Sequence, residues 1–392
     1  MINQCAKRMD DISPFYVMAI LERAKQLEEL GRDVIHMEIG EPDFPTPGTV
    51  SNSILANIAS GQIKYTPAAG LTELRKKIVS FYSQHYGVTV KQEQLFVTPG
   101  ASGAFLLALG CSLNPDQKIL MADPCYPCNS NFVKLFGGQA LTIPVDAATG
   151  FQLSAELVRK NWTSSCAGVL VASPSNPTGT LIPEDELAKM IQAVGQFKGA
   201  FYSDEIYHGL VYGKNANTAL QFSQDVFVIN SFSKYFGMTG WRIGWLVVPE
   251  AYIEATERLA QNIFIATGTL SQIAALAAFD PSTLAELESR RREFERRRDF
   301  LYEHLLRLGF IITAKPEGAF YIYADCSRFT RDSYQFAQAL LEEEYVAVTP
   351  GKDFGKHNAH KYIRLAYTTS IERMAEAIAR IERFINRYPS WQ

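Results

Sequence analysis

Lys234 lies in a run of residues whose types and spacing suit covalent chemistry. The run reads SFSKYFGMTGWRIG over residues 231–244, and the apolar segment VFVI at 226–229 precedes it. A lysine that is withdrawn from water at the end of a strand can lose its proton near neutral pH and add to a carbonyl group as a Schiff base. A lone lysine in a loop is usually a solvated charge, so the residues around it must decide between the two interpretations.

The hydroxyl and guanidinium groups near Lys234 suit a phosphate. Ser231, Ser233 and Arg242 supply these donors, which bind phosphate oxygens through charge-assisted hydrogen bonds. A second anion site is expected in the turn GASG at 100–103, because backbone N–H groups at the start of the following apolar helix point toward an anion. A Schiff-base lysine beside a phosphate site predicts a phosphorylated aldehyde, pyridoxal phosphate, as the cofactor.

Three further polar residues suit the ring of that cofactor. Asp204 ends the apolar segment 201–203, where a buried carboxylate calls for a cation such as a protonated pyridine nitrogen. The phenol of Tyr207 could reach the ring oxygen, and Asn176 offers an amide in the proline-rich turn 173–179. Taken alone, Asp204 also fits a structural cap and Asn176 an ordinary turn residue.

Other motifs in the sequence have competing interpretations. Residues 231–234 fit the S-x-x-K of serine β-lactamases and penicillin-binding proteins, but the S-D-N and K-T-G motifs of those enzymes are absent. An acyl hydrolase acting through Ser231 is a second alternative. The C-x-x-C at 125–128 and the H-x-x-H at 357–360 lack the further ligands of a metal site, so we expect reduced thiols and no metal.

Short apolar strands alternate with helical segments through the middle of the chain. The strand-like segments are 95–98, 118–121, 168–172, 200–203, 227–230 and 245–248. This alternation predicts an α/β fold with a mostly parallel sheet that has helices on both faces. Polar motifs follow these strands, where ligands bind in such sheets.

The two ends of the chain differ from the middle. We expect helices at 14–31, 283–308 and 371–387, and strands at 34–39, 320–323 and 362–367. The charged helix at 283–308 alternates arginine and glutamate, which favours a solvated helix with i,i+4 ion pairs over a nucleic-acid surface. The expected divisions are an N-terminal arm with part of a small domain (1–45), a large cofactor-binding domain (46–282) and a C-terminal small α+β domain (283–392).

The composition is that of a globular enzyme. The 392 residues are 47% hydrophobic and 20% charged, with a net charge of −3, which gives no support to nucleic acid as a partner. No apolar run reaches the length of a membrane span, and the N-terminus has no apolar core of signal-peptide type. We therefore expect a cytoplasmic protein that has no membrane partner.

Six segments in order resemble the class I and II aminotransferases, which have fold type I and depend on pyridoxal phosphate. The segments are GEPDF (40–44), YTPAAG (65–70), SNPTG (175–179), DEIY (204–207), SFSK with GWRIG (231–244) and IRLA (363–366). The resemblance extends from residue 38 to 367, and it implies a large domain with a seven-stranded, mostly parallel sheet and a smaller α+β domain.

The resemblance implies a role for each matching residue. Lys234 would be the Schiff-base lysine and proton shuttle, Asp204 would pair with the pyridine nitrogen, and Asn176 and Tyr207 would contact the ring oxygen O3′. The phosphate would be held by Ala101, Ser102, Ser231, Ser233 and Arg242.

The resemblance assigns the remaining residues to the ring, the substrate and the partner subunit. Tyr126 would stack on the ring. Gly40, Asn176 and Arg364 would bind the substrate, with Arg364 bidentate on its α-carboxylate. Tyr65 would reach the phosphate of the neighbouring subunit, which implies a homodimer with shared sites.

The implied reaction moves an amino group from an amino acid to a 2-oxo acid in two ping-pong half-reactions. A C–S lyase or an aminocyclopropane-carboxylate-type synthase would keep the same residues. A pyridoxal-binding transcription regulator would need a helix-turn-helix before the fold, and only about 33 residues precede the first expected strand.

Substrate choice is expected to depend on residues that no motif fixes. Aspartate/prephenate-type relatives often have a lysine where this chain has Ser102, so we expect a preference for neutral or aromatic amino acids, or a broad one. The aromatic side chains that could line the pocket are Phe15, Tyr16, Phe264 and Phe320, although a place in the core suits each of them better.

Overall fold

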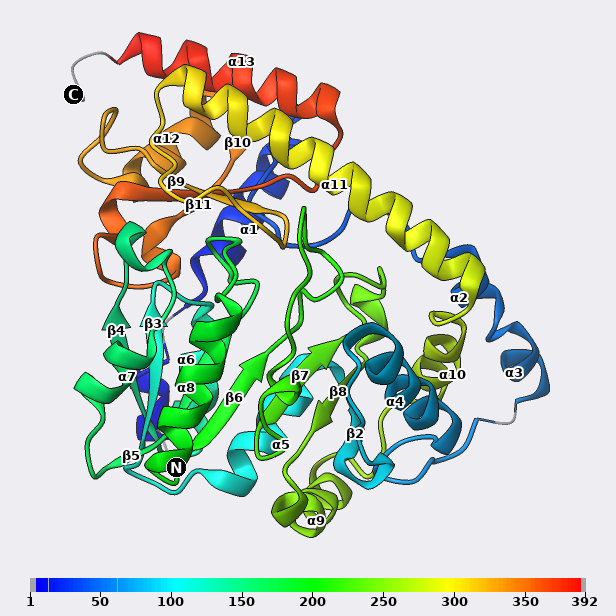
Figure 1. The fold of residues 1–392 in the computed structure, drawn as a ribbon. Coiled ribbons are helices and arrows are strands. Elements are labelled where there is room, and N and C mark those ends of the chain that lie inside the picture. Colours follow the sequence, from blue (N-terminus) through cyan, green and yellow to red (C-terminus); the bar gives the residue numbers. More distant parts are fainter. Residues whose placement is uncertain (1–4, 13, 62, 389–392) are drawn as a thin grey trace.

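A seven-stranded sheet forms the centre of the larger part of the molecule in the computed structural model, which describes residues 5–12, 14–61 and 63–388 (Figure 1). The strand order is β2-β8-β7-β6-β5-β3-β4. Strands β3 to β7 run parallel, and β8 is antiparallel to both of its neighbours. The prediction of a mostly parallel sheet is therefore confirmed. The strands are β2 (Leu95–Thr98), β3 (Lys118–Asp123), β4 (Gln139–Pro144), β5 (Cys166–Ala172), β6 (Ala200–Asp204), β7 (Phe227–Ser231) and β8 (Gly244–Val247).

Helices cover both faces of this sheet because successive strand residues point to opposite sides. On β7, Val228 packs in the cluster that includes residues of α4, α7, α8 and α10, whereas Phe227 and Ile229 pack in the cluster that includes residues of α5 and α9. The helices of the larger part are α2 (Gly48–Asn52), α3 (Leu55–Ser60), α4 (Thr72–Tyr86), α5 (Gly100–Ser112), α6 (Pro127–Leu135), α7 (Ala155–Asn161), α8 (Glu184–Gln196), α9 (Ile253–Ile263) and α10 (Thr269–Ala277).

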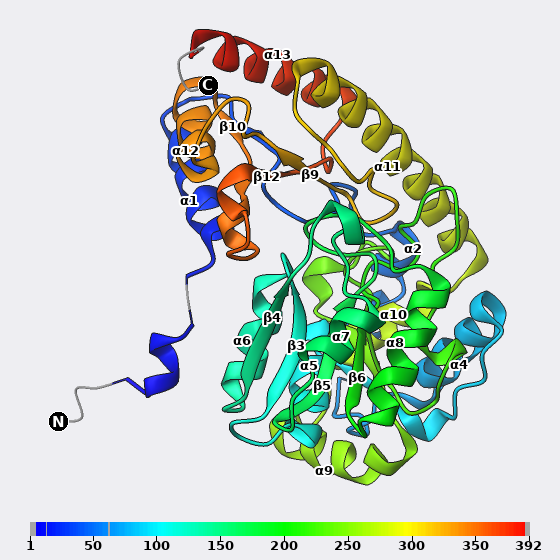
Figure 2. The same cartoon turned by 60° about the vertical axis from the view of Figure 1, so that its left-hand side comes forward.

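A smaller α+β part lies beside the sheet and contains elements from both the N-terminal and the C-terminal regions of the chain (Figure 2). Its antiparallel sheet has the order β11-β12-β9, and β1 pairs in parallel with β10. Its strands are β1 (Ile35–His36), β9 (Tyr321–Asp325), β10 (Val346–Ala347), β11 (Thr349–Pro350) and β12 (Tyr362–Ala366). Its helices are α1 (Tyr16–Glu29), α11 (Pro281–Leu308), α12 (Ser333–Glu344) and α13 (Ile371–Arg387).

The long helix α11 carries the ion pairs that its sequence predicts. Arg291 lies 3.0 Å from Glu295, and Arg297 lies 3.2 Å from Glu293, both at i,i+4 spacing. The strand expected at 34–39 is shorter than predicted, because only Ile35 and His36 pair with β10. Within the described residues, no helix combines the length and the low polarity that a membrane crossing requires.

Candidate active site

A cavity of about 240 Å³ lies where the loops after β5, β6 and β7 meet the smaller part of the molecule. It is lined by every predicted site residue except Ser231 and Tyr65. The predicted residues at the cavity are Gly40, Ala101, Ser102, Tyr126, Asn176, Asp204, Tyr207, Ser233, Lys234, Arg242 and Arg364. The fold thus brings together residues from five of the six sequence segments.

Lys234 follows the buried strand β7 and points its amine into the cavity. Its Nζ donates a hydrogen bond to the carbonyl oxygen of Gly40 at 2.7 Å. Burial lowers the pKa of Lys234 to about 8; the charge of Glu41 opposes this shift, and the nearby Arg364 and Arg242 add to it. The amine is therefore easier to deprotonate than an ordinary lysine.

Asp204 occupies the end of β6 and is only 5% exposed. Burial raises the pKa of its carboxyl to about 7, while hydrogen bonds from the Ile206 N–H and from Asn129, and the charge of Lys234, act in the opposite direction. Asp204 makes no ion pair with any described residue. A buried carboxylate without an ion-pair partner fits a protonated ring nitrogen, which would supply a cation in direct contact with it.

The start of helix α5 is built to hold an anion. No side chain caps this helix, so its first backbone N–H groups are available. A Cβ at Gly100 would lie 2.8 Å from Nη2 of Arg242, and one at Gly244 would lie 3.0 Å from the Ala101 nitrogen. Because neither glycine has a side chain, the guanidinium of Arg242 and strand β8 can approach the start of α5. The N–H groups of the helix and this guanidinium are donors that fit a phosphate.

The two serines of the lysine run lie at different depths. The Oγ atoms of Ser231 and Ser233 are 2.9 Å apart, and Ser231 Oγ is 3.1 Å from the carbonyl oxygen of Ile243. Ser233 lines the cavity, whereas Ser231 is buried behind it. Ser231 thus contacts Ser233 in this structure and does not itself line the cavity.

Arg364 on β12 provides a buried guanidinium that lines the cavity. Its Nη1 donates to Oδ1 of Asn176 at 2.9 Å, and its Nη2 donates to the carbonyl oxygen of Glu38. Its Nε is buried and has no hydrogen-bond partner among the described residues. The guanidinium carbon lies 4.3 Å from the ring centre of Tyr321 and 4.8 Å from that of Phe354. A buried cation with an unused donor fits a carboxylate ligand.

Comparison with known proteins shows the family to which most of the chain is similar. A family model described as "Aminotransferase class I and II" matches residues 32–381. The chain belongs to the class I and II aminotransferases. The predicted family and the predicted pyridoxal-phosphate-dependent aminotransferase activity are confirmed.

The relatives of this aminotransferase carry several substrate names. Valine–pyruvate aminotransferase of Mycobacterium tuberculosis is 37% identical over 94% of this chain and 96% of the relative. Aspartate aminotransferase of Bacillus subtilis is 32% identical over 98% of this chain and 99% of the relative. A solved structure of an aminotransferase from Mycobacterium tuberculosis has a TM-score of 0.94 at 36% identity, covering 98% of this chain and 100% of that chain. The two relatives therefore differ in the substrates that their names give.

The walls of the aminotransferase cavity contain residues that the sequence did not reveal. They are mostly apolar or aromatic side chains: Val17, Met18, Ile39, Phe105, Phe132, Ile206 and Tyr321. Tyr321 directly follows Phe320, which was a pocket candidate, and the alternation of side chains along β9 is the signal that could have identified it. Four of the others come from helices whose apolar residues look alike in sequence, namely Val17, Met18, Phe105 and Phe132, whereas Ile39 and Ile206 lie in loops.

Only one of the four aromatic pocket candidates lines the cavity. Phe15 does, and its ring meets that of Tyr126 edge to face at 6.1 Å. Phe320 is buried in the core cluster of the smaller part. Tyr16 packs against Tyr334 at 5.7 Å, and Phe264 packs on the cluster around α5. Tyr16, Phe264 and Phe320 therefore do not line the cavity, and Phe264 and Phe320 fit the alternative that these side chains belong to the core.

The remaining sequence motifs show no separate site. The thiols of Cys125 and Cys128 are free, and burial raises the pKa of Cys125 to about 12. No cluster of His, Cys, Asp and Glu that could hold a metal occurs in the described part of the chain. The C-x-x-C at 125–128 and the H-x-x-H at 357–360 therefore form no metal-binding cluster among the described residues.

Proposed function

We propose that Lys234 binds pyridoxal phosphate covalently and that the enzyme transfers the amino group of a neutral or aromatic amino acid to a 2-oxo acid. One observation supports this substrate class. The cavity contains three cations, Lys234, Arg242 and Arg364, and each is needed for the cofactor or for the α-carboxylate. No described cation that lines the cavity is left for a second carboxylate.

The cofactor would supply an electron sink that weakens the bonds at the α-carbon of the substrate. The N–H groups of Ala101 and Ser102, with Ser233 and Arg242, would hold its phosphate, and Ser231 would support Ser233. Asp204 would keep its ring nitrogen protonated, because a nearby cation removes the cost of burying the carboxylate. Asn176 and Tyr207 would hold its ring oxygen, and Tyr126 would cover one face of the ring.

The protein residues would position the substrate and move its proton. Arg364 and Gly40 would bind the α-carboxylate and so orient the α-C–H bond. The amine of Lys234, with its pKa lowered to about 8, would act as the general base that takes the α-proton and as the acid that returns a proton later in the reaction. The amino group of the donor ends on the 2-oxo acid, so the reaction needs no oxidant or reductant.

The side-chain pocket would be formed by Phe15, Val17, Met18, Phe105 and Phe132. All five line the cavity, and apolar surfaces favour a substrate that gains by leaving water. A relative named valine–pyruvate aminotransferase supports this class. Relatives named aspartate aminotransferase support the alternative, a dicarboxylate substrate.

A panel of substrates separates these alternatives. Alanine, valine, phenylalanine and aspartate would be offered with pyruvate or 2-oxoglutarate, and both products would be quantified. We expect kcat/KM for the best neutral or aromatic donor to exceed that for aspartate by about tenfold or more. A preference for aspartate would overturn the proposed class. One new amino acid for each 2-oxo acid released distinguishes transfer from lyase or synthase chemistry.

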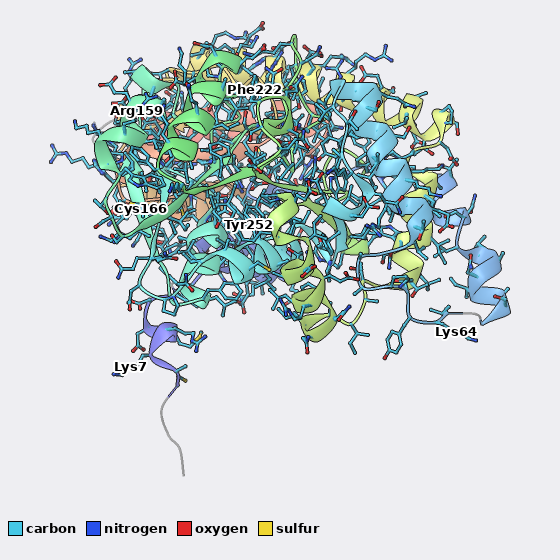
Figure 3. All side chains as sticks on the ribbon, turned by 60° about the horizontal axis from the view of Figure 1, so that its bottom comes forward. Lys7, Lys64, Arg159, Cys166, Phe222 and Tyr252 are labelled. Atoms are coloured by element: carbon cyan, nitrogen blue, oxygen red, sulfur yellow. The ribbon has the colours of Figure 1, made fainter. Side chains whose placement is uncertain are left out.

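We also propose that the enzyme works as a homodimer. Tyr65 is 82% exposed and does not line the cavity of its own subunit. The neighbouring Lys64 lies at the edge of the molecule in Figure 3, and its carbonyl oxygen accepts a hydrogen bond from Thr269 at 2.6 Å. In a dimer, Tyr65 would contribute its hydroxyl to the phosphate site of the other subunit.

A further inference from the structure

Tyr321 contacts three of the residues to which the proposed function assigns roles. Its hydroxyl oxygen lies 2.9 Å from that of Tyr207. Its ring lies under the guanidinium of Arg364 at 4.3 Å. A Cβ at position 40 would collide with its hydroxyl, so glycine is required there for Tyr321 to reach Tyr207. The position of Tyr321 is thus fixed from several sides, and its side chain is 1% exposed.

The two tyrosine hydroxyls share one hydrogen bond, and either oxygen could be its donor. If Tyr207 donates its own proton to a ligand in the cavity, then only Tyr321 can donate within the pair. A hydroxyl that accepts one hydrogen bond becomes a stronger donor in the next, because hydrogen bonds in a chain polarise one another. The pair therefore suits a two-step relay that ends at the ligand.

Electrostatics favour Tyr321 as the donor. Burial raises the pKa of Tyr321, and the positive charge of Arg364 over its ring opposes that rise. Burial also raises the pKa of Tyr207, where the charge of Arg364 again acts in the opposite direction. The guanidinium carbon of Arg364 lies 4.3 Å from the ring centre of Tyr321, and a cation over a phenol ring strengthens its hydroxyl as a hydrogen-bond donor. This contact favours the Tyr321 proton as the one that lies between the two oxygens.

We propose that Tyr321 is a positioning residue whose hydroxyl donates to Tyr207 and strengthens the hydrogen bond from Tyr207 to the ring oxygen of the cofactor. This inference rests on the proposed function. Tyr321 would also connect that hydrogen bond to Arg364, because the same ring supports the guanidinium that binds the substrate carboxylate.

The test is a pH titration of the visible absorbance of the holoenzyme. Removing a donor from the ring oxygen leaves that oxygen more basic, so the protonated form of the chromophore should persist to higher pH. We expect Tyr207→Phe to raise the titration midpoint and Tyr321→Phe to raise it by a smaller amount, roughly 0.3–1 pH unit. The double variant should match Tyr207→Phe alone, because Tyr321 acts only through Tyr207.

Tyr367→Phe is the matched control, since it removes another buried hydroxyl, which donates to the Ala319 carbonyl at 3.2 Å, away from Tyr207. It should leave the midpoint unchanged. An unchanged midpoint in Tyr321→Phe, or additive shifts in the double variant, would overturn the inference while leaving the proposed function intact. A wild-type protein that binds no pyridoxal phosphate would overturn both.

Discussion

Burial acts in opposite directions on the two central charges of the site. It lowers the pKa of Lys234 to about 8 and raises the pKa of Asp204 to about 7. Both side chains are thus held in a site that disfavours their charged forms while the cofactor is absent. This is the expected state of a site whose missing charges come with a ligand.

The lowered pKa of Lys234 predicts unusual reactivity in the cofactor-free protein. At pH 8 about half of the Lys234 amines should be neutral, against well under about 1% for a lysine in water. The rate of modification by trinitrobenzenesulfonate, followed by peptide mass spectrometry, should rise with a midpoint near pH 8. A peptide with one lysine is the reference, and a midpoint above pH 10 at Lys234 would contradict the prediction.

Asp204 should reduce the stability of the cofactor-free protein. Because its folded pKa is raised from 3.8 to about 7, its favourable contribution is complete below about pH 4 and is lost as the pH rises to about 7. Asp204→Asn should therefore raise the free energy of unfolding at pH 8 by on the order of 1–2 kcal/mol, and the gain should shrink toward pH 4. Urea titration measures this.

The same substitution should abolish most of the activity, because asparagine cannot stabilise a protonated ring nitrogen. Asp225→Asn, at an exposed position, is the control and should change neither stability nor activity. A destabilised Asp204→Asn protein at pH 8 would show that the carboxylate has a partner that compensates for its burial.

At the scale of residues, the sequence was informative where chemistry and a strand end coincide. Lys234 and Asp204 each follow an apolar strand, so their place in a shared site could be predicted. The contacts of Tyr321 with Tyr207 and Gly40 could not be predicted in this way, because they join segments far apart in the chain. Arg364 was assigned only through the resemblance to the family, since its Nη2 reaches a carbonyl oxygen 326 positions away.

Among the elements, the first turn of α1 forms one wall of the cavity and is held by a loop near the C-terminus. Phe15, Val17 and Met18 line the cavity. Asp353 accepts a hydrogen bond from the Tyr16 N–H at 2.8 Å and is only 6% exposed. The carboxylate of Asp353 thus accepts from a free N–H at the start of α1, as the side chain of an N-cap residue commonly does. Here the acceptor comes from a distant part of the chain.

Removing that carboxylate should loosen the wall. Asp353→Ala should lower the free energy of unfolding by about 1 kcal/mol and raise KM for neutral and aromatic donors several-fold, with a smaller change in kcat. Asp353→Asn keeps an oxygen that accepts from the Tyr16 N–H and should retain most of both properties. Equal KM values in Asp353→Ala and wild type would contradict a role for this contact in substrate binding.

The elements that the sequence did not reveal are those with weak patterns. Strand β4 (Gln139–Pro144) lies at the edge of the sheet and has only one buried residue, Ile143, so it lacks the continuous apolar run of the central strands. Helix α13, in contrast, has the predicted bounds, because its apolar residues recur at helical spacing and Ser370 caps it.

For the whole molecule, an apolar surface next to Tyr65 indicates where a second copy would bind. Leu55, Ile58, Ile63 and Ile265 are each between 46% and 59% exposed, and Thr269 ties this region together through its hydrogen bond to Lys64. Exposed apolar groups of this kind commonly mark an interface.

The limits of the two domains stay a prediction, since α11 runs along both parts of the molecule (Figure 1).

Charge placed on this surface should separate the subunits. Ile58→Asp and Ile265→Asp should shift the molecular mass in light scattering from dimer toward monomer and weaken cofactor binding, because Tyr65 would no longer reach the other subunit. Leu30→Asp, at a position that is 71% exposed at the end of α1, should remain dimeric. A wild-type protein that is monomeric at micromolar concentration would contradict the proposal.

Borohydride reduction followed by peptide mapping would show whether Lys234 carries the cofactor. The purified protein would be loaded with pyridoxal phosphate, reduced and digested, and the phosphopyridoxyl mass would be located. We expect this mass on Lys234, together with a visible absorption band that Lys234→Ala lacks. The mass on another lysine, or an unchanged band in Lys234→Ala, would show that Lys234 does not carry the cofactor.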